Sequence, residues 1–340
     1  MNLESIINEL QKDYEFIIQN HTSSNELKNN LWKKRLSKWS KRITSNGKID
    51  TKKLINFRAR AITLSETPCN PYYGFLILEN IYKFIHFSGF KETCFYNFNK
   101  VKNEKGYHWD TFSNVGNPFY YKKNGKIFNE RFIRHLRTVD LVKKYVKDEH
   151  NSIVVDIGGG YGQFLCMLEK INHFSKKILI EIPEQLLFAY FYIKKCFPNI
   201  KINNIRDVYK DNFSIEDELK KNDFVLIPDT LISKLDKINP DLICNFNSFG
   251  EMSNNDFNNY MNSMLLKNCN YLFLINRLDS FPTYKNKISI LDYNLERFDK
   301  LHFQTSPLWD YFFKSFSPLN IKKISFYSRM FEYIGKNKKI

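Results

Sequence analysis

The sequence predicts an α/β fold in which a parallel, doubly wound sheet follows a mainly helical N-terminal domain. Residues 153–157 form an apolar run of strand length that leads into a glycine-rich turn and then into apolar residues at helical spacing. From there to residue 275, further apolar runs alternate with helical patterns. Strands that alternate with helices are typical of parallel sheets, which bind ligands at the carboxyl ends of their strands.

The glycine-rich turn indicates which ligand this sheet holds. Its residues are spaced as Asp156-x-Gly158-x-Gly160-x-Gly162. The fingerprint of dinucleotide-binding folds needs a third glycine at the position that Gln163 occupies, so NAD and FAD are disfavoured. No Gly-Lys-Ser/Thr follows the turn, which excludes a P-loop. An acid at the strand tip would repel a pyrophosphate, but it suits a ligand that carries sulfonium and ammonium groups, as S-adenosylmethionine (SAM) does.

Four further strands and the helices between them are predicted from the same patterns. The strands are 177–181, 223–229, 241–246 and 271–275, and 200–205 is an alternative to 223–229. The helices are 130–147, 163–171, 183–197, and one that begins at Ser253 with Asp256 in a capping-box-like position. Residues 203–221 are predicted to be a polar loop, 306–316 a helix capped by Ser306-Pro307, and 321–334 a terminal hairpin.

Polar residues at the strand ends form the predicted cofactor site. Glu181 follows the turn by about 20 residues and ends a strand, where an acid accepts hydrogen bonds from ribose hydroxyls. Asp229 ends the next strand, where it would meet the adenine amino group. Asn247 follows the strand 241–246, and Tyr161 lies inside the turn. Because the carboxyl ends of parallel strands meet at one edge, we expect these side chains to converge with Asp156 on one crevice.

The N-terminal domain is predicted to span residues 1–130, and the cofactor-binding domain residues 131–340. Residues 1–60 carry apolar side chains at helical spacing among lysines, which favours a helical lid or a dimerisation element. Residues 68–121 are rich in aromatic and turn-forming residues. Aromatic rings bind the apolar faces of sugars, although the same rings also serve an ordinary core.

Length, composition and charge narrow the class of protein. The 340 residues are 43% hydrophobic and 16% aromatic, which is enough for a substantial core. No apolar stretch is long enough to span a membrane and no secretory leader is apparent, so a cytoplasmic location is expected. Six scattered cysteines indicate neither a disulfide framework nor a zinc site. The net charge of +16 comes from dispersed lysines, which disfavours a nucleic-acid ligand and suits a nucleotide-sugar, a phosphorylated glycan or an anionic lipid headgroup.

The sequence resembles a bacterial family of sugar O-methyltransferases, which are class I SAM-dependent methyltransferases found with surface-polysaccharide genes. The resemblance is carried by VVDIGGGYGQF, LIEIPE and PDLICNFNSFGEMS, with Asn56-Phe57-Arg58 and Gly116-Asn117-Pro118 upstream, and covers most of residues 30–335. It implies a Rossmann-like class I methyltransferase sheet, SAM as methyl donor with S-adenosylhomocysteine (SAH) as product, and a sugar hydroxyl as acceptor in capsule or lipopolysaccharide biosynthesis. The acceptor, free or linked to a nucleotide or lipid, is then expected to contact Arg58, Asn117, Ser248 and Arg277.

Methyl transfer to a sugar hydroxyl needs aligned reactants and a group that accepts the hydroxyl proton. Glu251 is the first candidate for this catalytic base because it follows the strand 241–246, although an acid there also suits a helix N-terminus. His108 and His302 are the second and third candidates. A divalent cation would need Asp229, Glu251 and Asp279 to lie together. No tight cluster appears in the sequence, and no metal site is predicted.

Other functions remain open at this point. An RNA methyltransferase would need a dense basic groove, and a natural-product methyltransferase would need a drier acceptor pocket. A protein that only binds SAM would consume none of it. A homodimer and peripheral contact with a membrane surface are also left open.

Overall fold

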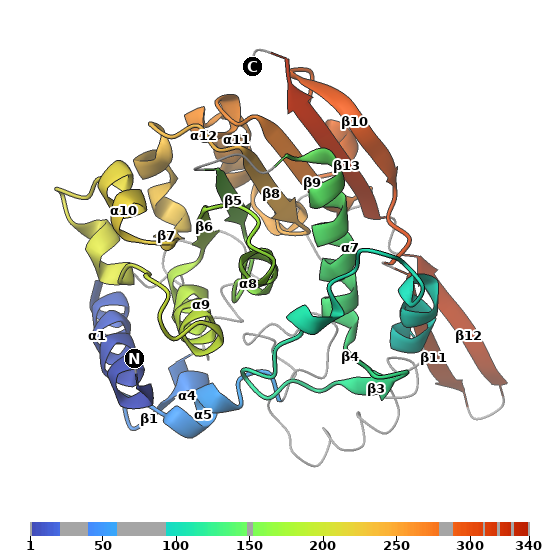
Figure 1. The fold of residues 1–340 in the computed structure, drawn as a ribbon, viewed down its shortest axis with the longest axis horizontal. Coiled ribbons are helices and arrows are strands. Elements are labelled where there is room, and N and C mark those ends of the chain that lie inside the picture. The colour runs from blue at the N-terminus through green and yellow to red at the C-terminus, as the bar shows by residue number, and fades with distance from the viewer. Residues whose placement is uncertain are drawn as a thin grey trace.

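The structure, a computed structural model, describes residues 2–20, 40–59, 93–147, 152–278, 288–308, 310–317, 320–327 and 330–338. Its main sheet has seven strands in the order β10-β13-β9-β8-β5-β6-β7 (Figure 1). The strands are β5 Ile153–Ile157, β6 Lys176–Glu181, β7 Phe224–Pro228, β8 Leu242–Phe246, β9 Tyr271–Arg277, β10 Phe298–Thr305 and β13 Met330–Asn337. Strands β5 to β9 are parallel, and β13 runs antiparallel between β9 and β10.

The strand order reverses between β5 and β8. Strand β5 pairs with β6 on one side and with β8 on the other, and the chain passes through β6 and β7 before it returns to β8. Such a reversal leaves a crevice at the carboxyl ends of the two central strands, where doubly wound folds bind ligands. The predicted doubly wound fold and its five predicted parallel strands are confirmed. The alternative strand 200–205 is wrong, since that segment contributes only an isolated bridge from Ile202 to Phe224.

Two apolar cores lie on opposite faces of this sheet. One contains Val154 and packs under the helices α7 Glu130–Tyr145, α8 Gln163–Lys170 and α9 Pro183–Cys196. The other contains Val155 and packs under α10 Ile215–Lys221, α11 Asn254–Asn262 and α12 Met264–Lys267. Figure 1 shows α7, α8 and α9 in front of the strands. Because successive strand residues point to opposite faces, strands covered on both faces are apolar nearly throughout, as β5, β7 and β8 are.

Side chains at the predicted helix starts cap two of these helices, and a proline begins a third. Asn129 accepts a hydrogen bond from the N–H of Phe132 at 2.9 Å and so caps α7. Ser253 Oγ accepts one from the N–H of Asp256 at 3.1 Å and caps α11. Pro183 stands in the first turn of α9, where its missing N–H would have no partner within the helix. The predictions of these helices are confirmed.

Three predicted segments are wrong. Residues 203–221 form the 3₁₀ helix η2 Ile205–Tyr209 and α10, which Ser214 caps, so they are not a loop. Residues 306–316 do not form a helix, because Asp310–Ser317 is strand β11 and pairs with β12, Asn320–Tyr327. The terminal hairpin is also wrong, since β13 pairs with β9 and β10 instead of β12. Alternating apolar residues predicted strands near the C-terminus, but register and partner depend on strands that are distant in sequence.

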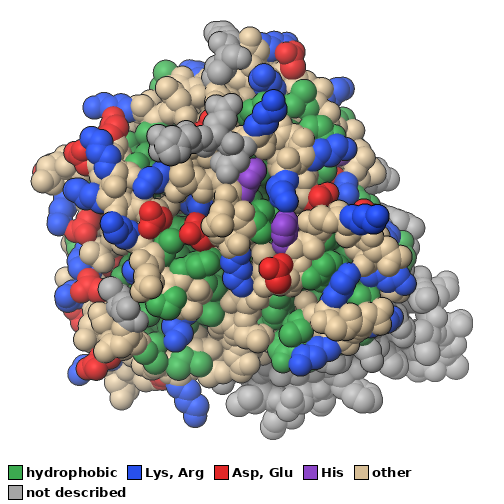
Figure 2. All heavy atoms as spheres, viewed as in Figure 1, with side chains coloured by type: hydrophobic (Ala, Val, Ile, Leu, Met, Phe, Trp, Pro, Cys, Tyr) green, Lys and Arg blue, Asp and Glu red, His purple; other side chains and the backbone are tan. Residues whose placement is uncertain are grey.

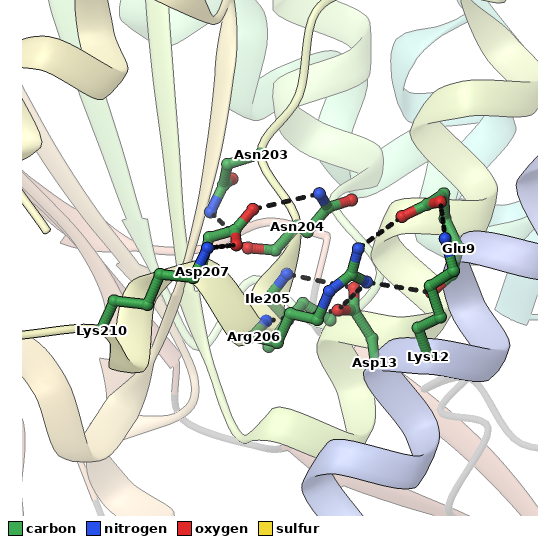
Figure 3. Close-up of polar contacts among 9 residues, drawn as sticks. All are labelled: Glu9, Lys12, Asp13, Asn203, Asn204, Ile205, Arg206, Asp207 and Lys210. Carbon is green, nitrogen blue, oxygen red and sulfur yellow. Dashed lines mark hydrogen bonds and ion pairs between the residues drawn. The ribbon is translucent and has the colours of Figure 1, made fainter.

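The N-terminal helix α1, Leu3–Asn20, packs against α9 and η2. Figure 3 shows the polar contacts that hold it there. Asp13 is fully buried and accepts hydrogen bonds from the N–H groups of Ile205 and Arg206 at 3.1 and 3.3 Å, and from Arg206 Nη1 at 2.8 Å. Arg206 Nη2 also pairs with Glu9 Oε2 at 2.6 Å. The first helix of the predicted N-terminal domain is therefore anchored directly to the part of the chain that forms the main sheet.

Short elements make up the rest of the described N-terminal region. They are α4 Ser40–Ile43, β1 Thr44–Ser45, β2 Lys48–Ile49, α5 Thr51–Ile55, a helical segment at 93–101, the 3₁₀ helix η1 Trp109–Thr111, β3 Tyr121–Lys123 and β4 Lys126–Phe128. The predicted apolar pattern of residues 27–39 and the aromatic residues 68–92 lie outside the described residues. None of the described helices is both long enough and apolar enough to cross a membrane.

Aromatic rings of the segment 93–132 pack mainly on one another. The rings of Phe98 and Phe128 stack with centroids 4.2 Å apart, and Trp109 meets Phe132 of α7 edge-on at 6.2 Å. Three described rings of this segment are exposed, Tyr96 at 40%, Phe119 at 46% and Tyr120 at 36%. Most of this segment therefore forms a core, and of its exposed rings Phe119 and Tyr120 lie next to the start of α7.

Candidate cofactor and acceptor site

The glycine turn between β5 and α8 is shaped by close packing. Gly158, Gly160 and Gly162 have φ angles of 72°, 64° and 80°, which residues with a Cβ rarely adopt. A Cβ on Gly158 would collide with the side chain of Ser248 at the tip of β8, and one on Gly160 would lie 3.2 Å from Nη2 of Arg131. The glycines therefore let Ser248 and Arg131 pack closely on the turn, and Gly158 to Gly160 stay partly exposed where the strand order reverses.

Asp156 lies directly beneath this turn. Its side chain is fully buried, a Cβ on Gly159 would touch its carboxyl group, and neither carboxyl oxygen has a hydrogen-bond partner in the part of the chain that the structure describes. Burial raises the pKa of Asp156 to about 7, against a smaller opposing effect of Arg131. An ionised acid in this environment is stabilised by a nearby positive charge, so the position favours a cationic ligand.

Glu181 is held against the same turn. Its Oε2 accepts a hydrogen bond from the N–H of Gly160 at 2.9 Å, and its Oε1 accepts one from the N–H of Ile182 at 2.9 Å. Burial, followed by the carboxyl groups of Asp229 and Asp156, raises the pKa of Glu181 to about 8. The side chain remains partly exposed, and each carboxyl oxygen keeps a second lone pair. Glu181 can therefore accept two further hydrogen bonds, as a ribose diol requires.

Asp229 and Asn247 reach the same edge of the sheet. Glu181 is paired with Pro228 across β6 and β7, so Asp229, which begins the 3₁₀ helix η3 Asp229–Leu235, lies beside it. Asn247 follows β8 with a φ of 71°, and its N–H donates to the carbonyl of Ile275 at 2.7 Å. Its Oδ1 is buried and has no hydrogen-bond partner among the described residues. This amide oxygen could accept a hydrogen bond from a ligand at the tip of β8.

A buried polar ladder fixes the tip of β8. Asn245 Nδ2 donates to the carbonyl of Ile157 at 2.9 Å and to Ser248 Oγ. Asn245 Oδ1 accepts hydrogen bonds from the N–H of Phe249 at 3.1 Å and from Asn276 Nδ2 at 3.0 Å. These bonds join β5, β8 and β9. Ser248, which the sequence predicted to contact the acceptor, is thereby placed against the glycine turn and supports it.

Sequence reasoning misses Arg131, which stands in the first turn of α7. Its guanidinium carbon lies 4.8 Å from the ring centroid of Tyr161, and its Nη2 is next to Gly160. Tyr161 itself is buried, and its hydroxyl donates to Gln163 Oε1 at 2.8 Å. A guanidinium at the turn can pair with the carboxylate of an amino-acid group in the ligand. The helix 130–147 was predictable, but only its packing shows that its first turn borders the glycines.

Glu251 and Arg277 lie at the carboxyl edge, as their places after strands predict. Glu251 ends the 3₁₀ helix η4 Phe249–Glu251, directly after the tip of β8, and its Oε1 accepts a hydrogen bond from Asn247 Nδ2 at 3.2 Å. Arg277 is the last residue of β9 and is partly buried. Both residues therefore lie at the edge of the sheet that also carries the glycine turn.

His108 is not brought to this edge. Its Nε2 lies 2.9 Å from Nζ of Lys143, near the other end of α7. Burial, with a further contribution from Lys143, lowers the pKa of His108 below its ordinary value. Lys143 is about 18 Å along the helix from Arg131, at 1.5 Å per residue. The structure thus separates this predicted catalytic residue from the glycine turn by most of the length of α7.

Arg58 and Asn117 connect the N-terminal segment to the turn. Arg58 is fully buried, its Nη1 donates to the carbonyls of Ser113 and Val115 at 3.0 and 2.9 Å, and its guanidinium carbon lies 5.1 Å from the Tyr161 ring centroid. Asn117 is exposed, and its Nδ2 donates to Asn56 Oδ1 at 3.0 Å. Arg58 therefore holds residues 113–116 beside Tyr161, a structural task in place of the acceptor contact that the sequence predicted.

His302 belongs to a buried network that joins α7 to the C-terminal strands. Its Nε2 lies 3.3 Å from Glu332 Oε2, while Nε and Nη2 of Arg137 donate to the two carboxyl oxygens of Glu332 at 2.7 Å each. Arg137 lowers the pKa of Glu332 against the effect of burial. His302 is therefore engaged in packing β10 and β13 onto α7.

Metal binding finds no support within the described ranges, where no group of three or more His, Cys, Asp and Glu side chains could hold an ion. Asp279, the third ligand of the alternative with a divalent cation, lies outside the described residues. The chemistry of the site is therefore argued from Arg131, Asp156, Glu181, Asn247 and the glycine turn.

These residues fit the chemical groups of SAM. Glu181 can accept hydrogen bonds from its ribose, Arg131 can pair with its carboxylate, and Asp156 suits its positive charges. A pyrophosphate would instead lie over Asp156 and beside the buried side chain of Gln163, where dinucleotide-binding folds need a glycine. The donor and acceptor set thus favours SAM over NAD.

No model of a known protein family matches this sequence, and no curated protein matches it. Among solved structures, the chain is similar to the methyltransferase domain of bacterial CtHen1, with 12% identity over 61% of this chain and 100% of that chain and a TM-score of 0.38. It is also similar to TehB of Haemophilus influenzae, with 10% identity over 62% of this chain and 68% of that chain and a TM-score of 0.38. For precorrin-6y C5,15-methyltransferase of Geobacter metallireducens, the identity is 14% over 60% of this chain and 89% of that chain, and the TM-score is 0.33.

The seven-stranded, mostly parallel sheet with helices on both faces is the Rossmann-like architecture that the resemblance to class I methyltransferases implies. The TM-scores to these solved structures are all below 0.5, so the function has to follow from this chain's own residues.

Proposed function

We propose that this chain is a SAM-dependent O-methyltransferase whose acceptor is a sugar hydroxyl. The observation that carries the proposal is the position of Glu181, which the N–H of Gly160 locks against a bare glycine turn while leaving acceptor capacity for a ribose. Asp156 beneath the turn and Gln163 after it distinguish this site from a dinucleotide site. When bound, SAM would supply a methyl group that its sulfonium centre makes electrophilic.

The chain's own residues hold and orient the reactants. Glu181 and Asp229 border the adenosine end of the crevice, and Arg131 borders the amino-acid end beside Gly160. The ladder through Asn245 keeps the tips of β5 and β8 in register, so the turn cannot shift independently of the acceptor edge. Such fixed positioning is a large part of catalysis in group transfer.

Two exposed rings support a sugar as the acceptor. The carbonyl of Phe119 accepts a hydrogen bond from Asn129 Nδ2 at 3.3 Å, which ties the rings of Phe119 and Tyr120 to the start of α7 and hence to the region of Arg131. Exposed aromatic faces pack against the C–H groups of sugar rings. Basic side chains on the face shown in Figure 2 are dispersed among acidic and polar ones, which gives an RNA acceptor no comparable support. The resemblance to sugar O-methyltransferases points the same way.

Calorimetry with SAM, SAH and NAD tests the cofactor. We expect SAM and SAH to bind and NAD not to bind. Glu181→Gln should weaken the binding of SAM by about tenfold to a hundredfold, because an amide in this place can leave the N–H of Gly160 without its acceptor, and an unpaired buried donor costs about 1–3 kcal/mol. Glu251→Gln is the control, and it should leave SAM affinity within about threefold, a difference below 1 kcal/mol. Binding of NAD in place of SAM would contradict the proposal.

A methyl-release assay tests the acceptor class. It should compare nucleotide-sugars, free sugars, a phenolic natural product and RNA, each with SAM. Methylation of a sugar hydroxyl supports the proposal, whereas methylation of RNA alone would refute the acceptor while leaving the cofactor assignment intact. SAM binding without turnover on any of these acceptors would favour a protein that only binds the cofactor.

A further inference from the structure

His135 of α7 belongs neither to the glycine turn nor to the polar networks described above. It lies one helical turn after Arg131, on the same face of the helix. Its ring centroid is 6.0 Å from that of Phe164, the second residue of α8, and 6.4 Å from that of Phe246, the last residue of β8. Because Phe164 follows the glycine turn and Phe246 precedes Asn247, the imidazole lies next to both segments that border the crevice.

The ring nitrogens of His135 take part in no hydrogen bond within the described part of the chain. Nε2 is buried without a partner, while the ring as a whole stays partly exposed. An unsatisfied buried polar atom costs about 1–3 kcal/mol, and a histidine that only filled space would normally find a partner. Glu251, in contrast, already accepts a hydrogen bond from Asn247. This difference makes His135 the better-prepared acceptor of a substrate proton.

The surroundings of His135 favour the neutral form of its imidazole. Burial, with Arg131 and Arg134 on its own helix and Arg58 from the N-terminal segment, holds the pKa of His135 well below its ordinary value. From α8 and β8 it meets the apolar rings of Phe164 and Phe246. A neutral imidazole has one nitrogen lone pair available, which is the form that a general base needs.

We propose that His135 accepts the proton of the acceptor hydroxyl during methyl transfer. This inference rests on the proposed function. As the hydroxyl oxygen forms its bond to the methyl carbon, the carbon–sulfur bond breaks, and its electron pair stays on the sulfur of SAH. The hydroxyl proton passes to the unprotonated nitrogen of His135, and the resulting imidazolium releases it to solvent. The three neighbouring arginines favour that release, which restores the neutral ring.

Protection from diethyl pyrocarbonate tests the location of His135 without any turnover. This reagent modifies accessible, unprotonated imidazoles, and peptide mapping identifies each modified histidine. Saturating SAH should slow the modification of His135 by roughly tenfold or more, since few sites then remain free. The control is His108, which is partly exposed near the other end of α7 and whose modification rate SAH should leave unchanged. Equal modification of His135 with and without SAH would overturn the proposal.

Turnover of matched variants tests the role. His135→Gln should lower kcat by about 10² to 10⁴ on any sugar that the wild-type enzyme methylates, and leave SAM affinity nearly unchanged. It should also remove the acid limb of the wild-type pH profile, a change that a structural role would not produce. His173→Gln is the control and should retain both kcat and the acid limb.

Three outcomes separate this proposal from the proposed function. Unchanged turnover in His135→Gln together with abolished turnover in Glu251→Gln would identify Glu251 as the base and overturn the proposal. Failure of the wild-type protein to bind SAM would refute the proposed function before His135 is tested. SAH protection of His135 without methylation of any sugar would contradict the acceptor class and still support the place of His135 beside the cofactor.

Discussion

Gly158→Ala tests whether the glycine turn is as tightly packed as the structure indicates. The new Cβ would collide with the side chain of Ser248, and the residue would have to keep a φ of 72°. Ser248 cannot yield freely, because its Oγ donates to the carbonyl of Ile157 at 3.2 Å and accepts from Asn245 Nδ2. The substitution should therefore reduce both the stability of the protein and its affinity for SAM.

The expected loss of stability is the sum of two effects. The left-handed backbone costs alanine about 1–2 kcal/mol. Displacement of Ser248 removes two hydrogen bonds that contribute about 1 kcal/mol each. The total of about 3–4 kcal/mol corresponds to a decrease in Tm of about 5 °C, given an unfolding entropy of about 2.1 cal/mol/K per residue.

Gly125→Ala provides the matched control. Gly125 also has a φ of 72°, but nothing lies within 4 Å of the position of its Cβ. Its substitution should lower the stability only through the strained left-handed backbone, which corresponds to a decrease in Tm of about 2 °C. Differential scanning calorimetry measures both variants, and titration with SAM should show at least about tenfold weaker binding for Gly158→Ala alone, equivalent to about 1.4 kcal/mol.

A double-mutant cycle completes the test. Ser248→Gly removes the atoms that would collide, so Gly158→Ala in that background should cost only about 1–2 kcal/mol. Equal decreases of Tm in Gly158→Ala and Gly125→Ala would show that the turn does not pack on Ser248. Undiminished SAM binding by Gly158→Ala would refute the assignment of this turn to the cofactor.

Three further predictions concern other parts of the molecule. The contribution of Asp156 and Glu181 to the free energy of unfolding should fall as the pH rises from about 4 to 8. Folding raises their pKa values from 3.8 and 4.5 to about 7 and about 8, so these two groups retain protons in the folded protein that the unfolded chain releases. Urea unfolding at several pH values measures this, and Asp156→Asn should flatten the profile. Cys196 should react first with iodoacetamide among the described cysteines, because a hydrogen bond with a neighbouring thiol lowers its pKa to about 7 and the other thiols are buried. Equal labelling of every described cysteine in a brief reaction would contradict this. Asp13→Ala should destabilise the protein by about 3 kcal/mol and make α1 accessible to proteases, because the N–H groups of Ile205 and Arg206 lose the buried carboxylate that accepts their hydrogen bonds; the exposed Glu4→Ala serves as control.

Much of the site could be predicted from sequence because its signals are local. The apolar run, the acid and the glycines around Asp156 lie within one strand, one turn and one helix, where backbone geometry determines which residue types fit. The place of Glu181 followed from the length of a single βαβ unit. The caps at Asn129 and Ser253 depend on hydrogen bonds to N–H groups only three residues away.

Other features of the molecule depend on contacts between distant parts of the chain. Arg58 was assigned to the acceptor, but a loop more than fifty residues later accepts its hydrogen bonds and buries it. The insertion of β13 between β9 and β10 likewise joins strands whose alternation pattern does not specify their partners.

Sequence alone determined that a parallel sheet carries an acid, a run of glycines and a second acid at one edge, because these residues are neighbours along the chain or one βαβ unit apart. Only the tertiary structure decided what Arg131 and His135 contact, namely Gly160 for Arg131 and the rings of Phe164 and Phe246 for His135. They belong to a helix whose apolar period marks its buried face, but the identity of the residues opposite that face depends on how α7 packs against α8 and β8.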